Sequence, residues 1–250
     1  IPRLMFPISD DNPEPGTPFV TWGLIAICCA VFFLHASLPP GEAELAVYQY
    51  GLIPGVLFGS TVMMDAPVPA WATIFSSMFM HGGLAHLAGN MLYLWIFGDN
   101  IELAMGRLRF ILFYLLTGAA AALAHAFLVP ASTVPLVGAS GAISGVLGAY
   151  LLLYPHGRVQ VLLLPFPIIL LRTFYVPAIV VLGLWFLIQV VSGLMSPAEE
   201  AGVAFWAHVG GFVAGMVLVP FFKRRDVPLF HPAQPRVFDA RSRARRGPWG

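Results

Sequence analysis

The sequence predicts an all-α polytopic membrane protein whose core is a bundle of six transmembrane helices. Of its 250 residues, 58% are hydrophobic and 10% are charged, against about 25% charged residues in soluble domains. Several apolar stretches are close to the roughly 20 residues that a helix needs to span a bilayer. The Lys and Arg residues lie on one side of these stretches, as the positive-inside rule requires. Together these observations exclude an ordinary soluble domain.

The predicted spans follow from the length of each apolar stretch. Five are close to full length, at residues 18–37, 84–103, 108–128, 174–194 and 203–222. A sixth, at residues 139–154, covers only about 24 Å at a rise of about 1.5 Å per residue, so we expect one of its ends to lie below the membrane surface. Residues 159–171 are also apolar, but Pro165 and Pro167 break helices, which favours a buried or interfacial connector.

The distribution of charge sets the expected topology. With a cytoplasmic N-terminus, all 13 basic residues fall on the inside, and the external loops at residues 38–83, 129–138 and 195–202 contain none. A seventh span at residues 159–171 would move the basic tail outside. We therefore expect six spans with both termini in the cytoplasm, and a long first external loop that packs on or into the outer leaflet.

Three segments are expected along the chain. Residues 1–17 form a cytoplasmic leader that resembles no cleavable signal or transit peptide, and residues 18–222 form the membrane domain. Residues 223–250 are rich in Arg, Pro and polar residues, which predicts a disordered cytoplasmic tail that lies against anionic lipid headgroups. A minimal six-span core without a transit peptide favours a bacterial cytoplasmic membrane.

The overall charge and the cysteines point to no other class of partner. The net charge is +1, which does not suggest a nucleic-acid partner. Cys28 and Cys29 are adjacent in an apolar run, a spacing that suits neither a metal site nor a disulfide framework. We expect no cofactor and no metal, because no carboxylate accompanies the histidines in the outer half of the membrane.

Strongly polar residues occur at one depth of three predicted spans. His86 and Asn90 are spaced i and i+4 near the outer end of the second span, on one helix face, and His81 lies just before it. Ser140 begins the short fourth span, and His208 lies about 8 Å into the sixth. Because polar groups in a bilayer are costly, such residues are functional candidates.

Each of these residues also has a structural interpretation. Ser140 alone could simply allow close helix packing, Asn90 could bond neighbouring helices, and His208 could be a buried structural histidine. Their convergence at one depth favours a catalytic site over three separate structural roles.

The convergent residues suit acyl transfer. A serine becomes a nucleophile when a neutral imidazole takes its proton, so Ser140 and His208 are expected to form a pair. His86, Asn90 and the Ser140 backbone amide could stabilise the resulting oxyanion. The nearest carboxylates of the spans lie at the inner end of the second, which favours a Ser–His dyad over a triad.

Small residues would allow the fourth and sixth spans to meet closely. Gly141 and Gly145 form one GxxxG step, and Gly211 and Gly215 form another. Ser140 and His208 would then face each other across a glycine-lined contact.

These motifs resemble those of the rhomboid intramembrane serine proteases. The match extends from Trp71 to Pro220, with GASG at 138–141, HxxxN at 86–90 and AHxxGxxxG at 207–215, in the family order. The resemblance implies a six-helix rhomboid-like bundle, Ser140 as the nucleophile, His208 as the base, and His86 with Asn90 at the oxyanion site. The residues expected to support the site structurally are Gly138, Gly141, Gly211, Gly215, His81 and Glu102, the last within an ExxxG feature that ends at Gly106.

Two positions depart from the pattern of some relatives. A Tyr that stacks on the catalytic histidine stands four residues after the nucleophile in those relatives, whereas this chain has Ser144. Thr73 takes the place of an Arg that follows Trp in the first external loop. The base must therefore be oriented by other residues.

The sequence thus predicts a serine endopeptidase that cleaves transmembrane or juxtamembrane segments of other membrane proteins through an acyl-enzyme. Preferred substrates would contain weak helix formers, because a helix must unwind before its carbonyl can react. Family analogy suggests entry between the second and fifth spans, under a cap at residues 195–202. The alternative is a non-catalytic rhomboid-like protein that binds transmembrane helices, but such relatives typically lack the serine or the histidine. A small transporter would place its polar groups at mid-bilayer. The oligomeric state stays open.

Overall fold

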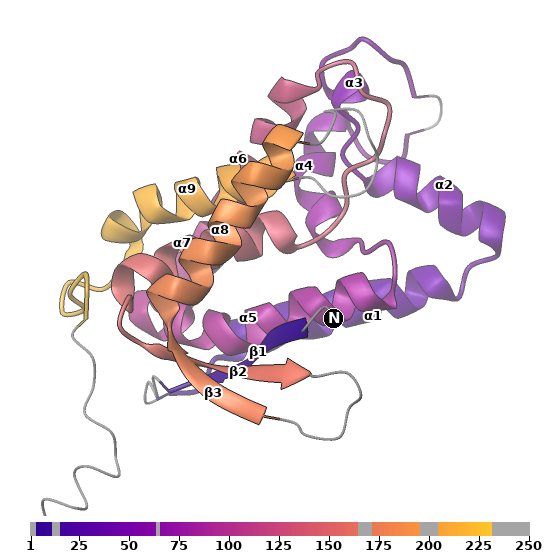
Figure 1. The fold of residues 1–250 in the computed structure, drawn as a ribbon. Helices are drawn as coiled ribbons and strands as arrows, with labels where there is room; N and C mark the ends of the chain where they lie inside the picture. Colours follow the sequence, from indigo (N-terminus) through magenta and orange to yellow (C-terminus); the bar gives the residue numbers. More distant parts are fainter. Residues whose placement is uncertain (1–3, 12–15, 64–65, 165–171, 196–204, 232–250) are drawn as a thin grey trace, which may run out of the picture.

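The computed structural model describes residues 4–11, 16–63, 66–164, 172–195 and 205–231, and it is mostly helical with a small sheet at one end (Figure 1). The longer helices are α1 (Phe19–Ala36), α2 (Pro40–Tyr50), α5 (Leu84–Met105), α6 (Arg107–Leu128), α7 (Ser140–Leu153), α8 (Ala178–Met195) and α9 (Phe205–Phe222). The short ones are α3 (Pro54–Leu57), η1 (Ala70–Ala72), α4 (Thr73–Ser76) and η2 (Ser77–Phe79), and the strands are β1 (Leu4–Asp10), β2 (Arg158–Leu164) and β3 (Arg172–Pro177).

Each of the six predicted spans contains a helix, but two of these helices are too short or too polar to count as spans on length and composition alone, so the six-span count stays a prediction. Among the described helices, α1, α6, α8 and α9 are long and apolar enough to cross a membrane. Helix α5 has 22 residues but carries Asp99 and Glu102, and α7 has only 14 residues. Large apolar side chains such as Leu108, Leu194 and Phe221 point outward and are more than two-thirds exposed. Outward apolar surface on long helices is what a bilayer solvates.

The all-α prediction is wrong at the sheet, which has the antiparallel order β1-β2-β3. The predicted leader, the predicted connector and the first residues of the predicted fifth span each supply a strand, with Met5 opposite Leu163 and Val161 opposite Phe174. Val159 and Val161 are buried, whereas Gln160 and Leu162 are only partly buried, which is the period of a strand. Residues 165–171, including Pro165 and Pro167, lie outside the described part of the chain.

Helix α7 lies at the centre of the bundle, against α5, α6 and α9. Val146, Ala149, Tyr150 and Leu153 have no exposed surface. On its other side, a Cβ at Gly145 would overlap Thr117 of α6. Neighbouring helices therefore shield most of the short helix, and its first residue, Ser140, is partly buried.

The backbones of α7 and α9 touch at glycines. A Cβ at Gly211 would overlap the Gly141 carbonyl oxygen, and a Cβ at Gly215 would overlap that of Gly145. The two GxxxG steps therefore pack against each other, and any larger side chain at Gly211 or Gly215 would force the helices apart.

At the opposite end from Ser140, Glu102 joins α5 to the start of α1. Its carboxylate accepts hydrogen bonds from the backbone amides of Val20 (3.0 Å) and Thr21 (2.7 Å) and from the Thr21 hydroxyl (2.8 Å). The first amides of a helix lack partners within it, and a carboxylate there is favoured by the helix dipole. Glu102 lies outside the candidate site.

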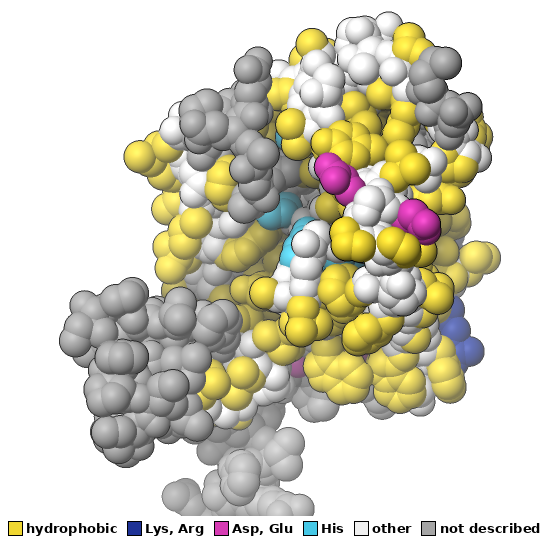
Figure 2. Space-filling view, turned by 90° about the vertical axis from the view of Figure 1, so that its right-hand side faces the viewer, with side chains coloured by type: hydrophobic (Ala, Val, Ile, Leu, Met, Phe, Trp, Pro, Cys, Tyr) yellow, Lys and Arg dark blue, Asp and Glu magenta, His cyan; other side chains and the backbone are white. Residues whose placement is uncertain are grey.

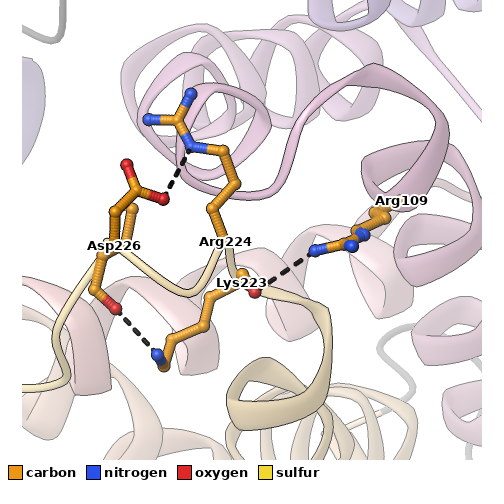
Figure 3. Close-up of polar contacts among 5 residues, drawn as sticks. Arg109, Lys223, Arg224 and Asp226 are labelled. Atoms are coloured by element: carbon orange, nitrogen blue, oxygen red, sulfur yellow. Dashed lines mark hydrogen bonds and ion pairs between the residues drawn. The ribbon is translucent and has the colours of Figure 1, made fainter.

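The predicted tail begins as ordered chain rather than disordered chain. Backbone amides of Arg224, Phe230 and His231 donate to the carbonyls of Ala104, Leu152 and Leu153, carbonyls that a helix C-terminus leaves unsatisfied. Figure 3 shows Arg109 donating to the Lys223 carbonyl (3.4 Å) and Arg224 beside Asp226 (3.7 Å). The predicted disorder is wrong for residues 223–231, and residues 232–250 lie outside the described part of the chain.

Candidate active site

Ser140 is the first residue of α7, and His208 lies near the start of α9. His208 Nε2 is 2.8 Å from Ser140 Oγ, and both side chains are partly buried. This distance is within the range of about 2.6–3.2 Å for a nucleophile and its base. The glycine contact between α7 and α9 brings the two side chains together, because the serine and histidine each precede the first glycine of their helix's GxxxG step.

The second ring nitrogen of His208 contacts α8. His208 Nδ1 is 2.8 Å from Gln189 Oε1. The rings of Trp185 and His208 are 5.9 Å apart and tilted by 37°, and Trp185 also packs on Phe212. Ser144 has no ring that could stack on the histidine, and its hydroxyl donates a hydrogen bond to the Ser140 carbonyl at 2.6 Å. Two residues of α8 thus hold the His208 ring where the stacking Tyr of some relatives is missing.

His86 and Asn90 lie beside the loop that leads to Ser140. Gly138 has φ +128°, and a Cβ there would be 2.7 Å from His86 Cε1 and 3.7 Å from Asn90 Nδ2. Its amide donates to the Ser77 carbonyl at 2.9 Å, which anchors the loop. Glycine is required at position 138 both for its backbone conformation and for this close approach.

Asn90 and His81 carry buried polar atoms with no hydrogen-bond partner in the described structure, at Nδ2 and Nε2 respectively. Such orphaned groups are rare in proteins and call for an explanation. Asn90 is 8% exposed, and the His81 ring contacts His86 edge-on with centroids 5.3 Å apart. Histidine side chains are visible in a recess at the centre of one face (Figure 2). Of the two orphaned atoms, Asn90 Nδ2 is the one that lies beside the Gly138 backbone.

The predicted site residues divide into two groups. Near Ser140 lie His208, His86, Asn90, His81, Gly138, Gly141 and Gly211, whereas Gly215 lies deeper along the helix contact and Glu102 lies at the far end. Within the described ranges no group of three or more His, Cys, Asp and Glu residues could hold a metal ion. The expectation that the site works without a cofactor stays a prediction.

Gln189 is the residue that the sequence analysis missed. A signal existed, since this amide stands in the apolar fifth span, where a polar side chain is costly. Trp185 lies one helical turn away from Gln189 on the same helix. Neither position falls in a recognised motif, and only the packing of α8 on α9 shows that both face the base.

Comparison with known proteins identifies the family. Residues 69–225 match the model of the rhomboid domain, which is more than half of the chain. The chain belongs to the rhomboid family. Together with its apolar helices, this makes it an integral, multi-pass membrane protein.

Several curated rhomboids are similar to this chain. It is 33% identical to rhomboid protease GluP of Bacillus subtilis over 138 residues, or 55% of this chain and 25% of GluP. It is 35% identical to mitochondrial rhomboid protein 1 of Saccharomyces cerevisiae over 99 residues, or 38% of this chain and 29% of that protein. It is 29% identical to rhomboid protease AarA of Providencia stuartii over 223 residues, or 81% of this chain and 72% of AarA. The chain thus spans under a third of the first two rhomboids and most of AarA.

Proposed function

We propose that this rhomboid is an intramembrane serine endopeptidase that cleaves transmembrane or juxtamembrane segments of other membrane proteins. The observation that carries the proposal is the 2.8 Å contact between Ser140 Oγ and His208 Nε2 across the glycine contact of α7 and α9. Related proteins named as rhomboid proteases support the same reaction class.

In the proposed reaction, His208 Nε2 takes the Ser140 proton while Oγ attacks the scissile carbonyl carbon. The imidazolium then gives this proton to the leaving amine, the peptide C–N bond breaks, and an acyl-enzyme remains. A water molecule, deprotonated by the same nitrogen, hydrolyses the ester and restores the serine hydroxyl. Asn90 Nδ2, the His86 ring and the Ser140 backbone amide would donate hydrogen bonds to the oxyanion.

The setting of this reaction follows from the positions of Ser140 and the charges. Six spans with both termini in the cytoplasm would open the site to the extracytoplasmic side, and a bacterial inner membrane suits that arrangement. Substrates would be helices rich in weak helix formers, admitted between α5 and α8. The cap proposed for this entrance lies at residues 195–202, mostly outside the described residues.

The test is cleavage of a single-span model substrate by the purified protein in liposomes. Ser140→Ala and His208→Ala should each abolish cleavage, while Ser76→Ala and His156→Ala, matched changes outside the dyad, should keep it. A fluorophosphonate probe should label the wild type at Ser140 and leave Ser140→Ala unlabelled. Cleavage that survives in both dyad variants, or a wild type that neither cuts nor reacts with the probe, would instead favour a non-catalytic helix-binding rhomboid.

A further inference from the structure

The base of the proposed dyad has two ring nitrogens, and each is held by a different helix. Nε2 faces Ser140 of α7 at 2.8 Å, and Nδ1 faces the side-chain oxygen of Gln189 on α8, also at 2.8 Å. An amide oxygen can only accept a hydrogen bond, so Nδ1 must carry the hydrogen. A neutral imidazole with Nδ1–H leaves Nε2 unprotonated. This is the tautomer that can take the serine proton.

We propose that Gln189 is a positioning residue that selects the reactive tautomer of His208. The proposal rests on the proposed function and adds a third member to the dyad, an amide where soluble serine proteases use a carboxylate. The opposite amide orientation would present N–H to Nδ1 and place the ring hydrogen on Nε2, which could then not accept the serine proton. The direction of this one hydrogen bond therefore decides whether the base is competent.

The burial of Gln189 supports a specific role. The side chain is 8% exposed, on a helix of otherwise almost entirely apolar composition. An amide in such a place costs free energy unless it is hydrogen-bonded. Its carbonyl oxygen lies 2.8 Å from His208 Nδ1, so the bond satisfies this oxygen and fixes the ring.

The position of Trp185 on α8 also supports a positioning role for Gln189. Trp185 and Gln189 are spaced i and i+4, so they lie on one helix face, and both contact His208. Most other large side chains of this helix are exposed, while Leu182 and Gly193 continue the same buried stripe. The ring of the base is thus packed by Trp185 and hydrogen-bonded by Gln189 from a single helix.

The size of the effect can be bounded. Enforcing the wrong tautomer in a serine protease triad costs about 10⁴-fold in kcat. Removing the acceptor leaves the productive tautomer partly populated, so Gln189→Met, of similar volume, should lower kcat by about 10- to 100-fold with little change in KM. Gln189→Glu keeps an acceptor oxygen in the same place and should restore most of the loss.

The experiment combines kinetics with a readout that needs no turnover. Nitrogen-15 shifts of the His208 ring, in protein labelled at histidine and reconstituted in lipid, should show hydrogen on Nδ1 in the wild type and in Gln189→Glu. Gln189→Met should show a mixture of tautomers. Leu182→Met, an equally conservative change on the same buried stripe, is the control and should match the wild type in both kcat and ring shifts.

The outcomes separate this inference from the proposed function. Wild-type cleavage together with an unaltered tautomer and kcat in Gln189→Met would overturn the role of Gln189 while leaving the protease intact. A wild-type ring with hydrogen on Nε2 would overturn it as well. If no variant cleaves but the tautomer still depends on Gln189, the positioning role stands and the proposed reaction fails.

Discussion

At the scale of single residues, Asn90 distinguishes a catalytic role from a structural role for the polar side chains near Ser140. Its side chain is 8% exposed, and its Nδ2 has no hydrogen-bond partner in the described structure. A residue that bonded neighbouring helices would use its donor for that bond. An oxyanion donor, in contrast, is left free until the reaction needs it.

Asn90→Leu should therefore lower kcat by about 10²- to 10³-fold, the usual effect of removing one oxyanion donor. The same change should leave the unfolding midpoint unchanged or higher, because it removes a buried amide hydrogen with no partner. Cleavage assays and thermal unfolding in the same detergent measure both effects. A marked loss of stability with activity retained per folded molecule would show that Asn90 is structural.

At the scale of elements, strand β1 connects the start of the chain to α5 and α7. The Tyr150 hydroxyl of α7 donates to Asp10 Oδ2 at 2.6 Å, and Asn100 Nδ2 of α5 donates to the same oxygen at 2.9 Å. Burial raises the pKa of Asp10 from 3.8 to about 7, and the bond from Tyr150 opposes this only in part. The strand thus joins the far end of α7 through a carboxylate that resists ionisation.

The raised pKa of Asp10 makes stability depend on pH. In the folded state Asp10 keeps its proton up to about pH 7, whereas in the unfolded chain it loses the proton near pH 3.8. The contribution of Asp10 to the free energy of unfolding is therefore complete below pH 3.8 and is lost as the pH rises to about 7. Asp10→Asn removes the titration and should flatten the pH dependence of the unfolding midpoint over this range. Glu44→Gln, an exposed carboxyl, should leave it unchanged. An identical pH profile in Asp10→Asn and wild type would contradict the assignment.

At the scale of the whole molecule, the positions of charge and exposure predict which face meets each compartment. Val62, in the first predicted external loop, is 81% exposed, and the Asp226 side chain beyond α9 is 74% exposed. The two lie on opposite sides of the predicted six-span bundle.

Single cysteines at these two positions test the topology, in protein whose Cys28 and Cys29 are replaced by Ala. In intact cells, an impermeant maleimide should label Val62→Cys, and it should reach Asp226→Cys only after the membrane is opened. The positive-inside distribution of Lys and Arg is the physical reason. Equal labelling of both cysteines in intact cells would require an even number of spans between them, whereas the predicted topology places five there.

Much of the fold and site could be predicted from local signals. Apolar stretches located the long helices, because a bilayer demands a minimum length of apolar chain. The short length of residues 139–154 placed Ser140 at a sheltered helix end. The GxxxG steps predicted the close contact of α7 and α9, because glycines four residues apart lie on one helix face and let another helix approach closely.

Other features depend on contacts between distant segments, and only the tertiary structure decided them. Strand β1 exists because Met5 meets Leu163, a pairing across more than half the chain that no local pattern encodes. The orientation of His208 depends on how α8 packs on α9, and this brings Gln189 to a nitrogen 19 residues away in sequence. The chain by itself determined where its helices lie and which groups could react. Packing decided which neighbours hold them, since a hydrogen bond is set by distance in space and not by spacing in sequence.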